Sequence, residues 1–240
     1  MKIDDKKANN EYIRGIYNAA QKAWAENDNW HIHTHDFINN YVINAVSRYS
    51  NSKSKILNAG SGGSTYSIPG IFYNCDIAEK LIENSVNPII ASVEDLPCDD
   101  EFFDYSICVG SVLNYCDATS AISELSRTLK SGGLLVLEFE RSNSSEFIFT
   151  SQYGKQIFPM IYDYNGETHH LWMYNEQYIS QLLNVYSFDV KNKRRFHSFS
   201  SLVFRATRRM EAGKYIKYDF LTQPFNYFLA HNVIYTCQKK

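Results

Sequence analysis

Long apolar runs are missing from this chain of 240 residues. No window reaches the run of about eighteen apolar residues that a membrane-spanning helix needs, so none is expected. The first residues, Met1-Lys2-Ile3-Asp4-Asp5-Lys6, contain no apolar segment, and no secretory signal is expected there. The five cysteines form no C-x-x-C pair. This usage predicts a reduced, cytoplasmic protein rather than a disulfide framework or a zinc site.

A phosphate-binding loop of the form Gly-x-x-x-x-Gly-Lys is also missing, which argues against ATP hydrolysis. The net charge of the whole chain is close to zero, but the two parts of the sequence differ in the sign of their net charge. Residues 1–150 contain twelve Lys and Arg against twenty Asp and Glu, whereas residues 151–240 contain twelve against six. The basic C-terminal part is either a solvated face or a docking surface for an anionic partner.

A glycine-rich turn is the most informative motif that is present. The apolar run Lys55–Asn58 leads into Gly60-Ser61-Gly62-Gly63, and Asp76 ends a second apolar run sixteen positions after Gly60. Glycine lacks a Cβ atom, so a ligand can approach the main chain closely and the turn can adopt positive φ. A carboxylate placed after the second strand can accept hydrogen bonds from the hydroxyls of a ribose.

The surrounding pattern predicts alternating strands and helices. Short apolar runs predict strands at 55–58, 71–75, 89–91, 104–109 and 134–138, with a helix from about 118 to 130 that ends at Gly132. Strands of this kind form a parallel sheet that is covered on both faces. Between Gly62 and Phe72 the segment is short and contains Pro69 and Gly70, so a loop or a vestigial helix is predicted there.

The order of these motifs resembles the class I S-adenosylmethionine (SAM) dependent methyltransferases, and most closely their small-molecule branch. The resemblance covers roughly residues 50–140, including Ala91–Leu96, Ser106–Tyr115 and Leu129–Phe139. It implies an α/β, Rossmann-like, seven-stranded and mostly parallel sheet with an antiparallel last strand. Residues 1–240 would form one domain: a helical lid over 1–50, a SAM-binding core over 51–140, and a substrate cap with strands six and seven over 141–240.

Outside the core, periodicity predicts helices at 10–26 and 37–49 with a polar connection over 27–36. An irregular, aromatic-rich insertion is expected over 140–174, followed by a helix over 175–186. Strand six is predicted at 188–196, a second insertion at 201–230 and strand seven at 232–238.

The resemblance implies cofactor contacts from four segments, with SAM as the cofactor and S-adenosylhomocysteine (SAH) as its product. They are the turn Ala59, Gly60, Ser61 and Gly62 for the methionine arm, Asp76 and Ile77 for the ribose, Ser92, Val93 and Glu94 for adenine, and Gly110 and Ser111 beneath the sulfonium. Ser92 stands where the family usually has Asp, so it offers a hydrogen bond without a charge.

A general base is needed only if the acceptor is protonated at working pH. Candidates are His33, His35, Tyr115, His169, His170 and His231. We favour His35 as the base and Tyr115 as a pocket residue. The alternating His31, His33 and His35 have no acidic partner at metal-site spacing, so no metal is predicted.

The leading hypothesis is methyl transfer to an oxygen or nitrogen of a small molecule. The Asn/Asp-Pro-Pro-Tyr motif of methyltransferases acting on adenine or glutamine is missing, since this position reads Ser111-Val112-Leu113-Asn114-Tyr115. Two alternatives stay open: an RNA or protein methyltransferase that uses the basic C-terminal face, and a non-catalytic SAM-binding regulatory module. A nicotinamide dehydrogenase is disfavoured because Thr65 occupies the position of the third glycine in G-x-G-x-x-G.

Overall fold

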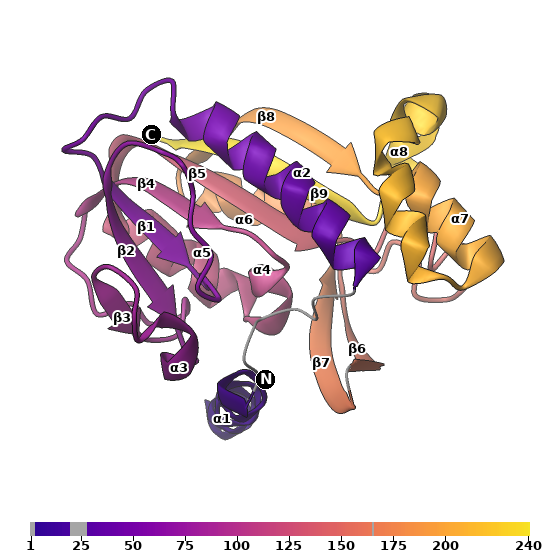
Figure 1. Cartoon of the computed structure of the whole chain (residues 1–240), viewed down its shortest axis with the longest axis horizontal. Helices are drawn as coiled ribbons and strands as arrows, with labels where there is room; N and C mark the ends of the chain where they lie inside the picture. The colour runs from indigo at the N-terminus through magenta and orange to yellow at the C-terminus, as the bar shows by residue number, and fades with distance from the viewer. Residues whose placement is uncertain (1–2, 20–27, 165) are drawn as a thin grey trace.

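Seven strands form the central sheet of the protein, of which a computed structural model describes residues 3–19, 28–164 and 166–240. The strands lie in the order β3-β2-β1-β4-β5-β9-β8, and β9 runs antiparallel to both of its neighbours (Figure 1). Their bounds are β1 Lys55–Ala59, β2 Ile71–Asp76, β3 Pro88–Ile90, β4 Phe103–Cys108, β5 Leu129–Glu140, β8 Phe188–Phe196 and β9 Asn232–Lys239. The predicted α/β, Rossmann-like sheet with its antiparallel last strand is confirmed.

Alternating side chains on these strands build two hydrophobic layers. Ile56 of β1 packs into the layer under α2 (Asn29–Val46), whereas Leu57 packs into the opposite layer. The second layer is closed by α5 (Ala118–Thr128) and α6 (Glu176–Val185). Because successive side chains of a strand point to opposite faces, a continuous apolar run supplies both layers at once.

The remaining elements surround the sheet. They are α1 Ile3–Ala19, α3 Glu79–Ile82, α4 Val112–Tyr115, α7 Phe199–Thr207, the 3-10 helix η1 Met210–Phe225 and α8 Asn226–Leu229. In Figure 1, α7 and α8 lie together beyond one end of α2, and α1 lies below the sheet. The close approach of η1 to α2 needs glycine, because a Cβ on Gly213 would lie 2.6 Å from Cα of Trp30. No described helix is both long enough and apolar enough to cross a bilayer.

The N-terminal helices differ from the prediction. α2 begins at Asn29, so residues 29–36 are helical rather than a polar connection, and the helix ends at Val46. The cause is Asp28, whose side chain accepts hydrogen bonds from the backbone N–H groups of Trp30 and His31 and so caps the helix. α1 ends at Ala19, and the part of the predicted first helix over 20–26 lies outside the described residues.

Strand β5 is longer than the predicted 134–138 segment. Helix α5 ends at Thr128, and β5 already begins at Leu129, which pairs with Phe103 before a register shift. Gly133 permits the irregularity, because a Cβ there would lie 2.9 Å from the carbonyl oxygens of Asp104 and Lys130. Gly132 and Gly133 therefore lie within an irregular strand. The prediction that the helix ends at Gly132 is wrong.

The region predicted as an irregular insertion over 140–174 contains a regular β-hairpin. Strands β6 (Ile157–Tyr164) and β7 (Glu167–Tyr174) pair antiparallel along their full length. Gly166, which follows the end of β6, has a φ of 82°, in the left-handed region. Figure 1 shows this hairpin projecting from the sheet on the side where α1 lies. The segment between Gly62 and Phe72 is a loop, which is one of the two predicted alternatives, and the other predicted strands agree within two residues.

A buried charge cluster joins α6 to the sheet. Glu176, at the start of α6, accepts hydrogen bonds from Lys193 and Arg195 on β8 at 2.7–2.8 Å. Its carboxylate also lies 3.1 Å from Arg141, whose side chain is fully buried. Burial opposes ionisation of Glu176, but these cations outweigh it and lower its pKa to about 2. Part of the basic C-terminal charge is therefore neutralised inside the fold.

Candidate functional site

The glycine turn after β1 forms one wall of a cavity at the carboxyl ends of the strands. Gly60, Gly62 and Gly63 adopt φ of 67°, 52° and 79°, the left-handed region that glycine reaches without strain. A Cβ on Gly60 would lie 2.3 Å from Cγ2 of Val112. Glycine is therefore required here both by the backbone conformation and by the close packing of the turn against α4.

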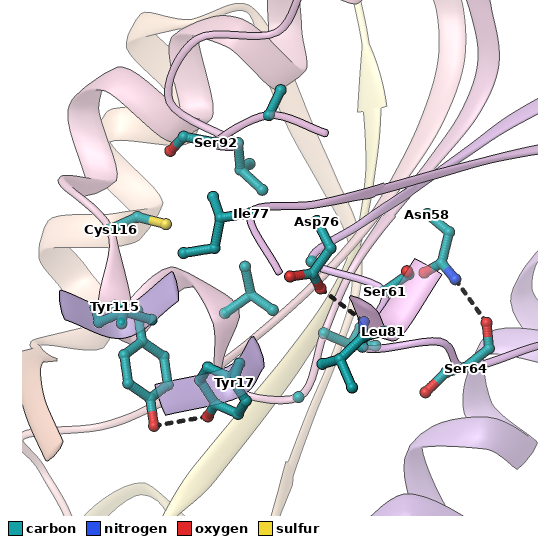
Figure 2. A pocket seen from close by; sticks show the side chains of 18 of the residues that line it. Tyr17, Asn58, Ser61, Ser64, Asp76, Ile77, Leu81, Ser92, Tyr115 and Cys116 are labelled. Carbon is teal, nitrogen blue, oxygen red and sulfur yellow. Dashed lines mark hydrogen bonds between the residues drawn. The ribbon is translucent and has the colours of Figure 1, made fainter. Parts of the chain in front are cut away.

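Asp76 lies at the end of β2, beside this turn, because β1 and β2 are parallel neighbours. Its Oδ2 accepts the N–H of Gly62 at 2.8 Å (Figure 2). Its Oδ1 accepts the N–H of Ala78 at 2.9 Å. Burial raises the pKa of Asp76, and the backbone N–H donors partly offset that effect. Each carboxylate oxygen retains acceptor capacity for a ligand hydroxyl.

The cavity encloses about 970 Å³ of empty space including its open mouth. Ten of the residues predicted from the sequence line it: His35, Gly60, Ser61, Gly62, Asp76, Ile77, Ser92, Val93, Gly110 and Tyr115. Three of the predicted cofactor contacts do not. Ala59 is buried in the core, Ser111 lines a neighbouring cavity, and Glu94 lies outside this wall.

Glu94 instead connects three elements around the site. It accepts the N–H of Asp117 at 2.6 Å and the side-chain amide of Asn10 on α1 at 3.1 Å. Ser92 lies within hydrogen-bond distance of the same carboxylate, at 3.3 Å, and accepts the backbone N–H of Glu94 at 3.2 Å. The contact with Asn10 helps to hold α1 against the cavity, whose wall also includes Ile13 and Tyr17.

Glu138 fixes the turn that follows β4, and sequence reasoning missed it. One of its oxygens accepts the N–H groups of Gly110 and Ser111 at 2.9 and 2.8 Å, and the other accepts the amide of Asn232 at 2.7 Å. Burial raises the pKa of Glu138 to about 7, although the hydrogen bonds from these donors act to lower it. The signal was present, since an acidic residue in the apolar run 134–139 is costly unless it is hydrogen-bonded.

A second cavity, with about 550 Å³ of empty space including its open mouth, adjoins the first and shares Tyr17, Gly110 and Tyr115 with it. It draws on α1, α2, α4, β5, the hairpin and β9. Its other lining residues are Trp30, His31, Thr34, Ser111, Glu140, Tyr162, Tyr164, His169, Leu171 and Asn232. Figure 2 shows Tyr17 and Tyr115 with their hydroxyls together at one side of the first cavity.

A chain of polar groups lies where the two cavities meet. Tyr17 donates to the hydroxyl of Tyr115 at 3.1 Å, and that hydroxyl lies 3.0 Å from Nδ1 of His169. Burial raises the pKa of Tyr115 well above its ordinary value and lowers that of His169. At neutral pH the phenol is therefore protonated and the imidazole is neutral, so Tyr115 can donate a proton toward His169.

Glu140 is the acidic group of the second cavity. It accepts the hydroxyl of Ser111 at 3.0 Å and lies 3.4 Å from Nε2 of His231. The other ring nitrogen of His231, Nδ1, lies 3.6 Å from Glu146. Burial disfavours the charged form of His231, but Glu140 and Glu146 outweigh it and raise its pKa to about 9. Burial opposes the ionisation of Glu140 as well, but His231 and Ser111 outweigh it and lower the pKa of Glu140, so this carboxylate is ionised at neutral pH.

The three alternating histidines lie on the first turns of α2 and not on a loop. Nδ1 of His31 is 2.6 Å from Asp28, which also accepts the hydroxyl of Tyr164 at 2.8 Å. His35 lines the first cavity beside Ile38. Within the described part of the chain, no group of three or more His, Cys, Asp or Glu side chains is arranged to hold a metal ion.

Comparison with known proteins identifies the central region. Residues 57–137 match a family model described as "Methyltransferase domain". No curated protein sequence matches the chain. The fold is similar to that of 1,6-didemethyltoxoflavin-N1-methyltransferase from Burkholderia thailandensis, crystallised with 1,6-didemethyltoxoflavin and SAH. That match has a TM-score of 0.58 and 10% identity, and it covers 100% of this chain and 91% of the other.

Two further structures extend the comparison. Geranyl diphosphate C-methyltransferase from Streptomyces coelicolor A3(2) has a TM-score of 0.57 and 10% identity, with 86% of this chain and 79% of the other covered. The cyclase SpnF has a TM-score of 0.57 and 15% identity, with 98% and 93% covered. At these identities the likeness establishes the fold, and a fold by itself hosts more than one chemistry.

Proposed function

Because the chain carries a class I SAM-dependent methyltransferase domain, we propose that it methylates an oxygen or nitrogen of a small molecule. The observation that supports this best is the meeting of two cavities at Tyr17, Gly110 and Tyr115. One cavity has the glycine turn and the acidic residue that suit a nucleoside-containing cofactor. The other is enclosed by side chains and suits a compact acceptor.

The residues of the first cavity fit SAM. A side chain at Gly60 would clash with Val112, so the turn presents bare main chain to the methionine arm. Asp76 has acceptor capacity left for the ribose hydroxyls, and Ser92 and Val93 line the part of the wall proposed for adenine. We propose that these residues, with Ser61, Gly62, Ile77 and Gly110, hold the cofactor.

When bound, SAM supplies a methyl group on a positively charged sulfur and leaves as SAH. The chain must then exclude water and hold the acceptor atom in line with that methyl group. Ile13, Ile38, Val109 and Val112 form an apolar wall that serves the first need. Tyr17 and Tyr115, which line both cavities, are placed to serve the second.

An acceptor that carries O–H or N–H has to lose a proton. We propose that the acceptor proton moves to the hydroxyl oxygen of Tyr115 while the proton of Tyr115 moves to Nδ1 of His169, 3.0 Å away. The lowered pKa of His169 leaves it neutral and able to accept. His35, the base favoured from the sequence, lines the cofactor cavity and is the second candidate.

Part of the basic C-terminal charge is not available to the RNA or protein alternative. Lys193 and Arg195 are engaged by Glu176, and Lys191 lies 3.6 Å from Asp189. Cations that are paired within the fold are not available to replace counterions on a phosphate backbone. A turnover measurement distinguishes the regulatory alternative, because a sensing module would bind SAH without transferring a methyl group.

The test is to supply SAM with a tritiated methyl group together with a panel of amines, phenols, alcohols and carboxylic acids, total RNA and denatured protein. Label is expected in the small-molecule fraction. His169→Ala and His35→Ala are compared for turnover, and each variant's affinity for SAH is measured as a control for the cofactor site. Label in RNA or protein would overturn the small-molecule assignment. SAH binding without any transfer would favour a regulatory module.

A further inference from the structure

The second cavity combines aromatic rings with a carboxylate. Trp30 from α2, Tyr17 from α1, Tyr115 from α4, and Tyr162 and Tyr164 from the hairpin all line it. Glu140 is the carboxylate on the wall, and among the described lining residues there is no Lys or Arg. The faces of aromatic rings carry partial negative charge, so these groups together disfavour an anion and attract a cation.

Charged groups of both signs lie around this cavity. Glu140 shares His231 with Glu146, at 3.4 and 3.6 Å, and Glu138 lies behind the wall on Asn232. On α2, His31 is matched by Asp28 at 2.6 Å. Burial raises the pKa of Glu138 to about 7, so it is partly protonated at neutral pH, and Glu146 also faces the charge of Arg208. Glu140 is therefore the carboxylate that the cavity wall offers to a cation.

We propose that the methyl acceptor is a compact organic ammonium, bound with its charged nitrogen near Glu140 and its hydrocarbon part against the aromatic rings of this cavity. The inference rests on the proposed function, since it names the substrate class of that site. Tyr17 and Tyr115 border the cofactor cavity as well, so an ammonium held between them and Glu140 lies at the junction where transfer must occur.

The chemistry balances with one proton released. The bound ammonium gives one proton to Tyr115 and His169 and becomes a neutral amine with a free electron pair. That pair forms the new N–C bond as the S–C bond breaks, with its electrons remaining on the sulfur of the product SAH. The methylated nitrogen is again a cation, and the proton on His169 returns to solvent.

Three probes of equal size but different charge separate this inference from its rivals: butylammonium, 1-butanol and butyrate. The protein contains three tryptophans, so 5-fluorotryptophan labelling gives few fluorine signals, and a Trp30→Phe variant identifies the signal of Trp30 on the cavity wall. Each probe is titrated at constant ionic strength with SAH present, and SAH affinity is measured separately by calorimetry.

We expect the Trp30 signal to be half-shifted at a butylammonium concentration at least tenfold below that for butanol, with no response to butyrate. Glu140→Gln should reduce this preference to less than threefold. Asp163→Asn, which removes an exposed charge from the same hairpin outside the cavity, should leave it unchanged. Tyr162→Phe should retain the preference and Tyr162→Leu should weaken it, because the ring and not the hydroxyl attracts the cation.

Equal affinity for butanol and butylammonium, or binding of butyrate, would overturn the ammonium assignment. If SAH still binds in that case, the proposed methyltransferase function is unaffected. A preference that survives Glu140→Gln would also overturn it, because the charge would then be recognised elsewhere. Failure of SAH to bind would instead count against the proposed function itself.

Discussion

Replacing Asp76 by Asn tests whether this carboxylate holds the cofactor. In the wild type, one oxygen accepts the N–H of Gly62 and the other that of Ala78, which leaves further acceptor positions on both. The amide of Asn has one acceptor oxygen and no charge. The variant can therefore keep one of the two backbone contacts but cannot accept hydrogen bonds from both ribose hydroxyls.

The expected cost follows from the value of a hydrogen bond to a charged group. Losing such a bond weakens binding by about 1.5–3 kcal/mol, which corresponds to an increase of about 10- to 150-fold in the Kd for SAH. Burial raises the pKa of Asp76, so the wild-type affinity should also fall as the pH drops through that raised value. Asp76→Asn should lack this step, because it has no proton to take up there.

Isothermal titration calorimetry with SAH measures the loss, and urea unfolding of the ligand-free proteins shows whether the turn still folds. Asp99→Asn is the matched control, since Asp99 is exposed and outside the cavity. An Asp76→Asn variant that stays folded and binds SAH within threefold of the wild type would refute the assignment of Asp76.

Two further predictions concern the fold that supports the site. Gly60→Ala should lower the free energy of unfolding by about 1–2 kcal/mol because of the left-handed backbone and by about 1–3 kcal/mol because of the contact with Val112. In a Val112→Ala background only the second loss should disappear, as measured by urea unfolding. Glu176→Gln should destabilise the protein by about 3–5 kcal/mol by leaving Arg141 buried without its charge partner, and a loss below 1 kcal/mol would contradict that role. Because the folded pKa of Glu176 is depressed to about 2, its contribution of about 3 kcal/mol is complete above the unfolded pKa near 4.5 and is lost as the pH falls from there toward 2. The variant's stability should therefore be less sensitive to pH in that range.

Local patterns were sufficient for the core and for most of the proposed cofactor wall. The run before Gly60, the turn itself and Asp76 are separated by few residues, and adjacent parallel strands necessarily bring the ends of β1 and β2 together. The hairpin was harder, because the aromatic residues of 157–174 obscured its alternation and were interpreted as an irregular insertion. The start of α2 was missed because the cap at Asp28 follows a polar stretch that resembles a loop.

By itself, the sequence determined the parallel sheet, its two apolar layers and the glycine turn with Asp76, since hydrophobic periodicity and glycine placement act over a few residues. Only the tertiary structure decided the second cavity. Tyr17, Tyr115 and His169 are separated by 98 and 54 positions along the chain, and their hydrogen bonds depend on how α1, α4 and the hairpin pack together. Glu138 and Glu140 likewise acquire their roles from the turn after β4 and from the N-terminal end of β9, because a buried charge must find its partners in space.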